Sequence, residues 1–211
     1  MNNWLSHPLI LEDELVKLVP LAIEHFEELA DASSDEIIWT YMPVRGMDKD
    51  QLLFALKDAL KKREEGEQYP FVVVDKQTGR LIGSTRYLRL NKEYRNLEIG
   101  YTWYLPEYWG SGYNEACKLL LLTHCFETLK TVRVQIIASD LNVRSRRAIE
   151  RLGAVFEGVL RDVVIRNGNK RSVAYYSILE EEWPTVQSTL KALKTERLMQ
   201  HAQKRNSDNS R

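Results

Sequence analysis

The chain has little of what marks a nucleic-acid-binding, secreted or membrane-spanning protein. Its 211 residues include 30 basic and 30 acidic ones, so the formal net charge is zero and nothing attracts it to nucleic acid or to an anionic membrane. No apolar run approaches the ~20 residues that cross a bilayer, and the first eight residues do not resemble a secretion signal. We therefore expect a cytoplasmic protein with neither nucleic acid nor a membrane as its partner.

Cysteine and histidine are scarce and dispersed, which argues against a disulfide and against a metal site. The two cysteines, Cys117 and Cys125, fall on one predicted helix, where eight residues rise about 12 Å, too far for a disulfide. We expect both thiols to be reduced, in keeping with the cytoplasm, and no metal to be bound. The histidines have no metal-ligand spacing: His7, His25, His124 and His201.

Two common nucleotide-binding motifs are absent as well, but a short glycine loop is present. The spacing fits neither the Gly-x-x-x-x-Gly-Lys-Ser/Thr of a Walker loop nor the Gly-x-Gly-x-x-Gly of a dinucleotide fold. Gly110 and Gly112 instead stand between an apolar strand and a long apolar helix. Backbone N–H groups and the helix dipole attract an anion at such a place, so this loop is predicted to bind a phosphate group.

The hydrophobic pattern predicts an α/β fold, a mixed and mostly antiparallel sheet flanked by helices. An apolar fraction of 44% suits one sizeable core. The domain is expected to span 8–184, and 185–211 to hold an extra C-terminal helix (185–203) and a disordered polar tail. In chain order the expected elements are 9–21 (strand or bent hairpin), 22–32 and 48–66 (helices), 69–75, 80–90 and 97–105 (antiparallel strands), 111–129 (helix), 133–138 (strand), 142–152 (helix), and 158–166 and 171–180 (strands joined by an Asn167-Gly168 turn).

Four segments carry a resemblance to a known family. Residues 106–114 read Pro-x-x-Trp-Gly-x-Gly-x-Asn, and residues 142–153 read Asn-x-x-Ser-x-x-Ala followed by Leu-Gly. In this order they resemble the pyrophosphate loop and the second conserved segment of the GNAT superfamily of acyl-CoA-dependent N-acetyltransferases. The stretch 97–101 and the ending 178–184 are similar to the branch that acetylates ribosomal-protein amino termini. The resemblance covers nearly all of 9–184.

The resemblance implies a GNAT-like domain that moves an acetyl group from acetyl-CoA to a primary amine by direct attack on the thioester, without a metal. The acceptor would be a protein amino terminus or a small amine. Two departures from the family pattern keep an alternative open: Trp109 replaces an Arg or Gln, and Asn114 replaces a small residue. The alternative is a non-catalytic acyl-CoA-binding or regulatory module on the same fold. Self-association into a homodimer through the C-terminal helix is compatible with either function.

The same resemblance implies the residues that hold acetyl-CoA. Strand 97–105 would part from strand 133–138 near its end at 103–105, and the N–H of Tyr104 would face the thioester oxygen. The expected acetyl-CoA contacts are Trp103, Tyr104, Leu105, Trp109, Gly110, Ser111, Gly112, Tyr113, Asn114 and Asn142.

Glu98 is the expected general base. Strict alternation puts Glu98, Gly100, Thr102 and Tyr104 on one face of their strand, and a carboxylate in a central, covered strand is desolvated, which raises its pKa. The alternative is a solvated Glu98, or one paired with an arginine such as Arg86.

The remaining candidates have two readings each. Ser145 matches a position proposed to protonate the leaving thiolate, but it also fits a first-turn bond in a helix capped by Asn142. Arg144, Arg146 and Arg147 fit phosphate contacts or a solvated helix face. The acceptor-site candidates Trp39, Tyr41 and Met42 fit the substrate wall or ordinary packing, and Arg86 is the fourth residue expected on the substrate side.

Overall fold

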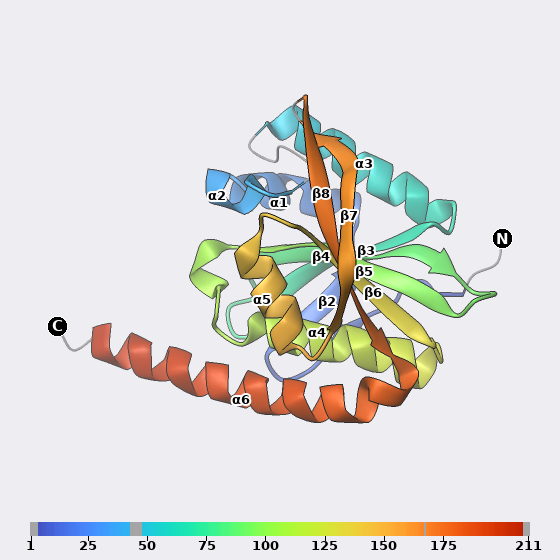
Figure 1. Cartoon of the computed structure of the whole chain (residues 1–211). Helices are drawn as coiled ribbons and strands as arrows, with labels where there is room; N and C mark the ends of the chain where they lie inside the picture. Colours follow the sequence, from blue (N-terminus) through green and yellow to red (C-terminus); the bar gives the residue numbers. More distant parts are fainter. Residues whose placement is uncertain (1–3, 43–47, 167, 209–211) are drawn as a thin grey trace.

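The computed structural model describes residues 4–42, 48–166 and 168–208. Eight strands form one sheet in the order β1-β2-β3-β4-β5-β6-β8-β7, and β5–β6 is the one parallel pair among these neighbours. Figure 1 shows α1–α3 on one side of the sheet and α4 with α6 on the other. The predicted α/β fold is therefore confirmed. The strands are β1 (Leu11–Glu12), β2 (Val16–Pro20), β3 (Gln68–Asp75), β4 (Leu81–Asn91), β5 (Asn96–Tyr104), β6 (Arg133–Ser139), β7 (Val155–Arg166) and β8 (Asn169–Leu179).

The helices follow the predicted order, with ends set by local capping. Asp48 accepts a hydrogen bond from the N–H of Gln51 at 3.1 Å and starts the third helix. Asn142 does the same for Ser145 in the fifth. Between the predicted helices 22–32 and 48–66, where no element was predicted, the described residues form one short helix. The helices are α1 (Phe26–Ala32), α2 (Glu36–Trp39), α3 (Lys49–Glu64), α4 (Tyr113–Thr123, continued by a π-helical turn, His124–Thr128), α5 (Val143–Arg151) and α6 (Trp183–Asp208), with 3₁₀ turns at Ile23–His25, Pro106–Tyr108 and Glu180–Glu182.

A β-bulge in β5 corrects the expected alternation of side chains. Arg86 of β4 lies opposite Gly100, but Ser84 lies opposite Trp103, so one residue of β4 faces two of β5. Tyr101, one of the two, has a φ of 49°. The extra residue turns the rest of the strand over, because side chains alternate with a period of two. Thr102 and Tyr104 therefore lie on the face opposite Glu98 and Gly100, and the prediction that all four share a face is wrong.

The two parallel strands part earlier than expected. Pairing between β5 and β6 comprises only Asn96–Arg133, Leu97–Val134 and Glu98–Gln135. Separation was expected near residues 103–105, but it begins directly after Glu98. The whole stretch from Ile99 to Tyr104 consequently lacks a strand partner on its β6 side.

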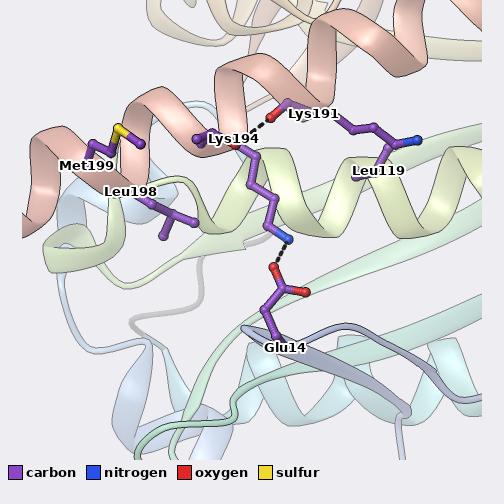
Figure 2. A pocket seen from close by; sticks show the side chains of 7 residues that line it. Glu14, Leu119, Lys191, Lys194, Leu198 and Met199 are labelled. Carbon is purple, nitrogen blue, oxygen red and sulfur yellow. Dashed lines mark hydrogen bonds and ion pairs between the residues drawn. The ribbon is translucent and has the colours of Figure 1, made fainter.

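Helix α6 is part of the core and is not an appendage. It begins at Trp183, whose ring stacks on Phe126 with centroids 5.3 Å apart, and Val186 and Leu190 are buried. Figure 2 shows Lys194 reaching from α6 to Glu14, and its Nζ also lies 2.8 Å from Asp13. Since α6 is helical to Asp208, the tail expected to be disordered from residue 204 is helical over its described part.

Behind the glycine loop α6 is in close contact with Gly112. A Cβ at Gly112 would lie 3.1 Å from Leu198 Cγ and 3.3 Å from the carbonyl oxygen of Lys194. Gly112 also has a φ of 95°, which favours glycine. The C-terminal helix thus supports the predicted phosphate loop from below.

We predict that a chain ending at Pro184 is destabilised by at least ~4 kcal/mol, because removing two buried aliphatic side chains costs about this much. Urea unfolding measures the difference. The control is a chain ending at Gln203, which keeps the buried part of α6 and should unfold within about 1 kcal/mol of the full chain. A chain ending at Pro184 that is as stable as this control would contradict the role given to α6.

Candidate active site

A cleft of about 860 Å³ opens where β5 and β6 diverge. Its walls come from the loop before α4, the first turns of α4 and α5, the segment after α2, and the ends of β4 and β8. Such a cavity is of the size that holds a cofactor. The structure brings the following predicted site residues together in its lining: Tyr41, Met42, Glu98, Trp103, Tyr104, Trp109, Gly110, Asn114, Asn142 and Ser145.

Other predicted residues stand behind this lining. Trp39 packs on Trp103 and donates its indole N–H to the carbonyl of Ser33 at 2.7 Å. Arg86 is buried with its guanidinium 4.6 Å from the ring centre of Tyr101. Four more belong to the loop or the core without lining the cleft: Leu105, Ser111, Gly112 and Tyr113. All six residues can therefore shape the site without facing the cleft.

Asp75, at the end of β3, fixes the glycine loop, and the sequence offered no sign of it. Its carboxylate accepts hydrogen bonds from the hydroxyls of Tyr108 at 3.1 Å and Tyr113 at 3.0 Å, on either side of the loop. Burial alone would raise the pKa of Asp75, but these bonds and those from Gln77 and Thr78 outweigh it and lower the pKa. Asp75 is therefore an ionised anchor for the loop.

The first turn of α4 has no side-chain cap, and Asn114 and Glu115 of this turn line the cleft. Its N-cap is Gly112, which has no side chain to accept from the first N–H groups. Asp48 and Asn142, by contrast, cap α3 and α5 with their side chains. A helix N-terminus without a side-chain cap is a place where an anion can bind, so phosphate binding at this loop stays a prediction.

The backbone of Tyr104 is turned into the gap left by β6. The N–H of Leu105 donates to Ile82 of β4 at 2.9 Å, and N–H groups in an antiparallel strand alternate in direction. The N–H and C=O of Tyr104 therefore point away from β4. The carbonyl accepts from the indole of Trp109 at 3.0 Å, which leaves the N–H directed at the cleft.

Glu98 is 3% exposed and lies where the two strands separate. Burial raises the pKa of its carboxyl, although hydrogen bonds from Gln135 and Arg89 oppose the rise. Both bonds reach Oε2, at 2.8 Å and 3.1 Å. A Cβ at Gly100 would lie 3.2 Å from Oε1, so this oxygen faces the small residue that lines the cleft. The alternative of a solvated Glu98 is wrong, and its arginine partner is Arg89 instead of Arg86.

Asn142 and Ser145 open α5 on the other wall. Asn142 Oδ1 accepts from the N–H of Ser145 at 3.0 Å, which is the capping role expected of it. The hydroxyl of Ser145 makes no hydrogen bond to another of the described residues, and the side chain is half-buried beside the cleft.

Comparisons with known proteins agree on the family. The model of the acetyltransferase (GNAT) domain matches residues 16–155. YdaF of Bacillus subtilis (strain 168), named as a candidate ribosomal N-acetyltransferase, is 39% identical over 105 residues, which are 50% of this chain and 57% of that protein. The chain belongs to the GNAT family of N-acetyltransferases.

Solved structures show the same fold in this family. A GCN5-related N-acetyltransferase from Brucella melitensis superimposes with a TM-score of 0.82 at 26% identity, covering 89% of this chain and 86% of that one. Mycobacterium smegmatis RimJ, solved with CoA-disulfide, has a TM-score of 0.75 at 21% identity, covering 88% and 95%. The GNAT fold binds acetyl-CoA or CoA, and acetyl transfer in this family implies an amine as acceptor.

The described residues also bear on the expectations about membranes, metals and disulfides. None of their helices combines the length and apolarity needed to cross a membrane. Within the same residues, histidine, cysteine, aspartate and glutamate do not gather into a group that could hold a metal ion. Cys117 and Cys125 are both free and buried.

Lys118 of this acetyltransferase is a buried cation that sequence analysis missed. It is 4% exposed, lines the cleft from α4, and donates to Thr102 Oγ1 at 3.0 Å. Among the described residues no carboxylate forms an ion pair with it. Burial therefore lowers its pKa to about 8. Its place on an otherwise apolar helix face was the available signal.

We predict that Lys118→Met changes how stability depends on pH. The pKa of Lys118 is about 8 in the folded state, against 10.5 for an ordinary lysine. Between these two pH values the unfolded chain holds more protons, so the parent gains stability as pH rises. At pH 7 the variant should be more stable than the parent by up to ~3 kcal/mol, and the difference should shrink towards pH 10.5. Urea unfolding at both pH values measures it. A difference that does not change with pH would show that Lys118 is not desolvated.

Proposed function

We propose that this acetyltransferase acts on the primary amine of a protein amino terminus or of a small molecule, by direct attack of the amine on the thioester. The observation that carries the proposal is a buried, raised-pKa carboxylate, Glu98, at the point where β5 and β6 part. A general base with such a pKa is suited to take a proton near neutral pH.

The residues present fit acetyl-CoA. The open N-terminus of α4 offers N–H groups to phosphate, and the unpaired edge of β5 offers backbone groups to the amides of the pantetheine arm. The candidates at the phosphate end are Trp109, Gly110 and Asn114, with Ser111, Gly112 and Tyr113 shaping the loop. Trp103, Tyr104 and Asn142 would hold the arm. When bound, acetyl-CoA supplies the activated acetyl group.

Three groups of the chain would share the chemistry. Glu98 Oε1 accepts the proton that the amine loses as its nitrogen bonds to the acetyl carbon. The N–H of Tyr104 donates to the carbonyl oxygen as negative charge develops there. Ser145 Oγ gives its proton to the sulfur once the carbon–sulfur bond breaks, and regains one from solvent.

The class of the acceptor amine is inferred from the residues that line the cavity near Glu98 and from similarity to a known protein. Tyr41 and Met42 line the same cavity as Glu98, together with 66–68 after α3 and 88–90 of β4. An amine bound against Tyr41 and Met42 would therefore share the cavity with Glu98. The name of YdaF, a candidate ribosomal N-acetyltransferase, favours a protein amine over a small-molecule amine.

We predict that Glu98→Gln lowers kcat/KM at least ~100-fold, the low end of what a general base contributes, and leaves the Kd for acetyl-CoA within about twofold. The assay follows CoA release with a peptide that has a free amino terminus, with the same peptide blocked, and with small amines. Full activity in Glu98→Gln would contradict the role of Glu98. Binding of acetyl-CoA without release of CoA in the presence of any of these amines would contradict the proposed function.

A second variant tests the pKa of Glu98 itself. Gln135 donates to Glu98 but does not line the cleft, and its bond lowers the pKa of Glu98. Gln135→Leu should therefore raise that pKa. The base must be ionised to act, so the acidic limb of the kcat/KM profile should move to higher pH in the variant. On acidification the variant should therefore begin to lose activity before the parent does. An unchanged acidic limb of the kcat/KM profile would mean that another group is the base.

A further inference from the structure

The glycine loop carries the wrong charge for a phosphate site. Residues 106–115 include two carboxylates, Glu107 and Glu115, and neither lysine nor arginine. Glu107 is paired with Arg80 at 3.0 Å, whereas Glu115 lines the cleft. An anion at the N-terminus of α4 therefore needs a cation from elsewhere in the chain.

Trp109 cannot bind the anion through its indole N–H. Its indole N–H is used by the carbonyl of Tyr104 at 3.0 Å, and this bond holds the ring in place beside Gly110. What Trp109 offers to the cleft is the face of its ring.

Arg144 of α5 occupies that face. Its guanidinium carbon lies 3.5 Å from the ring centre of Trp109, and both residues line the cleft. Stacking fixes the plane of a guanidinium without using its N–H donors, which project from the edge of the plane. The stacked Arg144 thus keeps a full set of donors beside the open end of α4.

The neighbouring arginines of α5 are placed differently. Arg146 donates to the hydroxyl of Tyr176 at 3.0 Å and to the carbonyl of Asp140 at 3.3 Å. Arg147 is exposed and does not line the cleft. Arg144 has no carboxylate partner among the residues that the structure describes.

We propose that Arg144, stacked on Trp109, supplies from α5 the cation that binds the diphosphate of acetyl-CoA. This inference rests on the proposed function and adds a residue to it. Trp109, in the place of a charged residue, is then a platform that presents an arginine from a helix more than thirty positions along the chain.

Calorimetry with three ligands tests the inference: CoA, dephospho-CoA, which keeps the diphosphate but lacks the 3′-phosphate, and pantetheine, which lacks both. Arg144→Ala should raise the Kd for CoA and for dephospho-CoA at least ~10-fold, because a hydrogen bond to a charged group contributes this much. Pantetheine binding should stay within about twofold. Arg147→Ala, the matched control, should bind all three like the parent.

A second variant separates charge from folding. Trp109→Arg in the Arg144→Ala background puts a cation back at the loop and should recover most of the lost CoA affinity. An Arg144→Ala protein that binds CoA like the parent, or that loses pantetheine equally, would overturn the inference. A loss with CoA but not with dephospho-CoA would overturn the diphosphate assignment in favour of the 3′-phosphate. A parent that binds no CoA would instead overturn the proposed function.

Discussion

The site depends on one constraint, the end of hydrogen bonding between β5 and β6 after the pair Glu98–Gln135. Parallel pairing up to that point holds the carboxylate of Glu98 in the sheet, desolvated and next to Gly100. Its loss beyond that point frees the backbone of Tyr104, and the bulge at Tyr101 sets which side chains face α4. The proposed base and the proposed oxyanion donor thus lie on one strand, on either side of a single break in the sheet.

The phosphate end is held by contacts that are distant in sequence. Asp75 of β3 binds both tyrosines around the glycine loop, and α6 packs beneath Gly112. Arg144 lies across the cleft on Trp109. The loop has a geometry that suits an anion, but its own charged side chains are acidic. The positive charge beside it belongs to Arg144 of α5, whereas contacts with β3 and α6 set its shape. The departure at Trp109 therefore does not imply a disabled site.

Much of this could be read from the sequence, and the exceptions have physical causes. Hydrophobic periodicity and caps such as Asp48 and Asn142 are local, so the family, the strands and all the helices but the short α2 were predicted. The bulge was not, because Tyr101 is not a residue type that signals a positive φ. Nor could pattern reveal Asp75 or the Arg144–Trp109 stack, since each depends on segments brought together by the fold. Lys118 did give a local signal, a cation on an apolar helix face, but its contact with Thr102 depends on the fold. The helical span to Asp208 was underestimated because its polar end gives no periodic signal.

The most direct test of the central claim is a crystal structure of the complex with acetyl-CoA. We expect the acetyl group in the gap between residues 99–104 and 136–138, with its carbonyl oxygen within hydrogen-bond distance of the N–H of Tyr104 and the diphosphate at the first turn of α4. An acetyl group bound outside this gap, with β5 and β6 paired beyond Glu98, would contradict the dependence of the site on the break in the sheet.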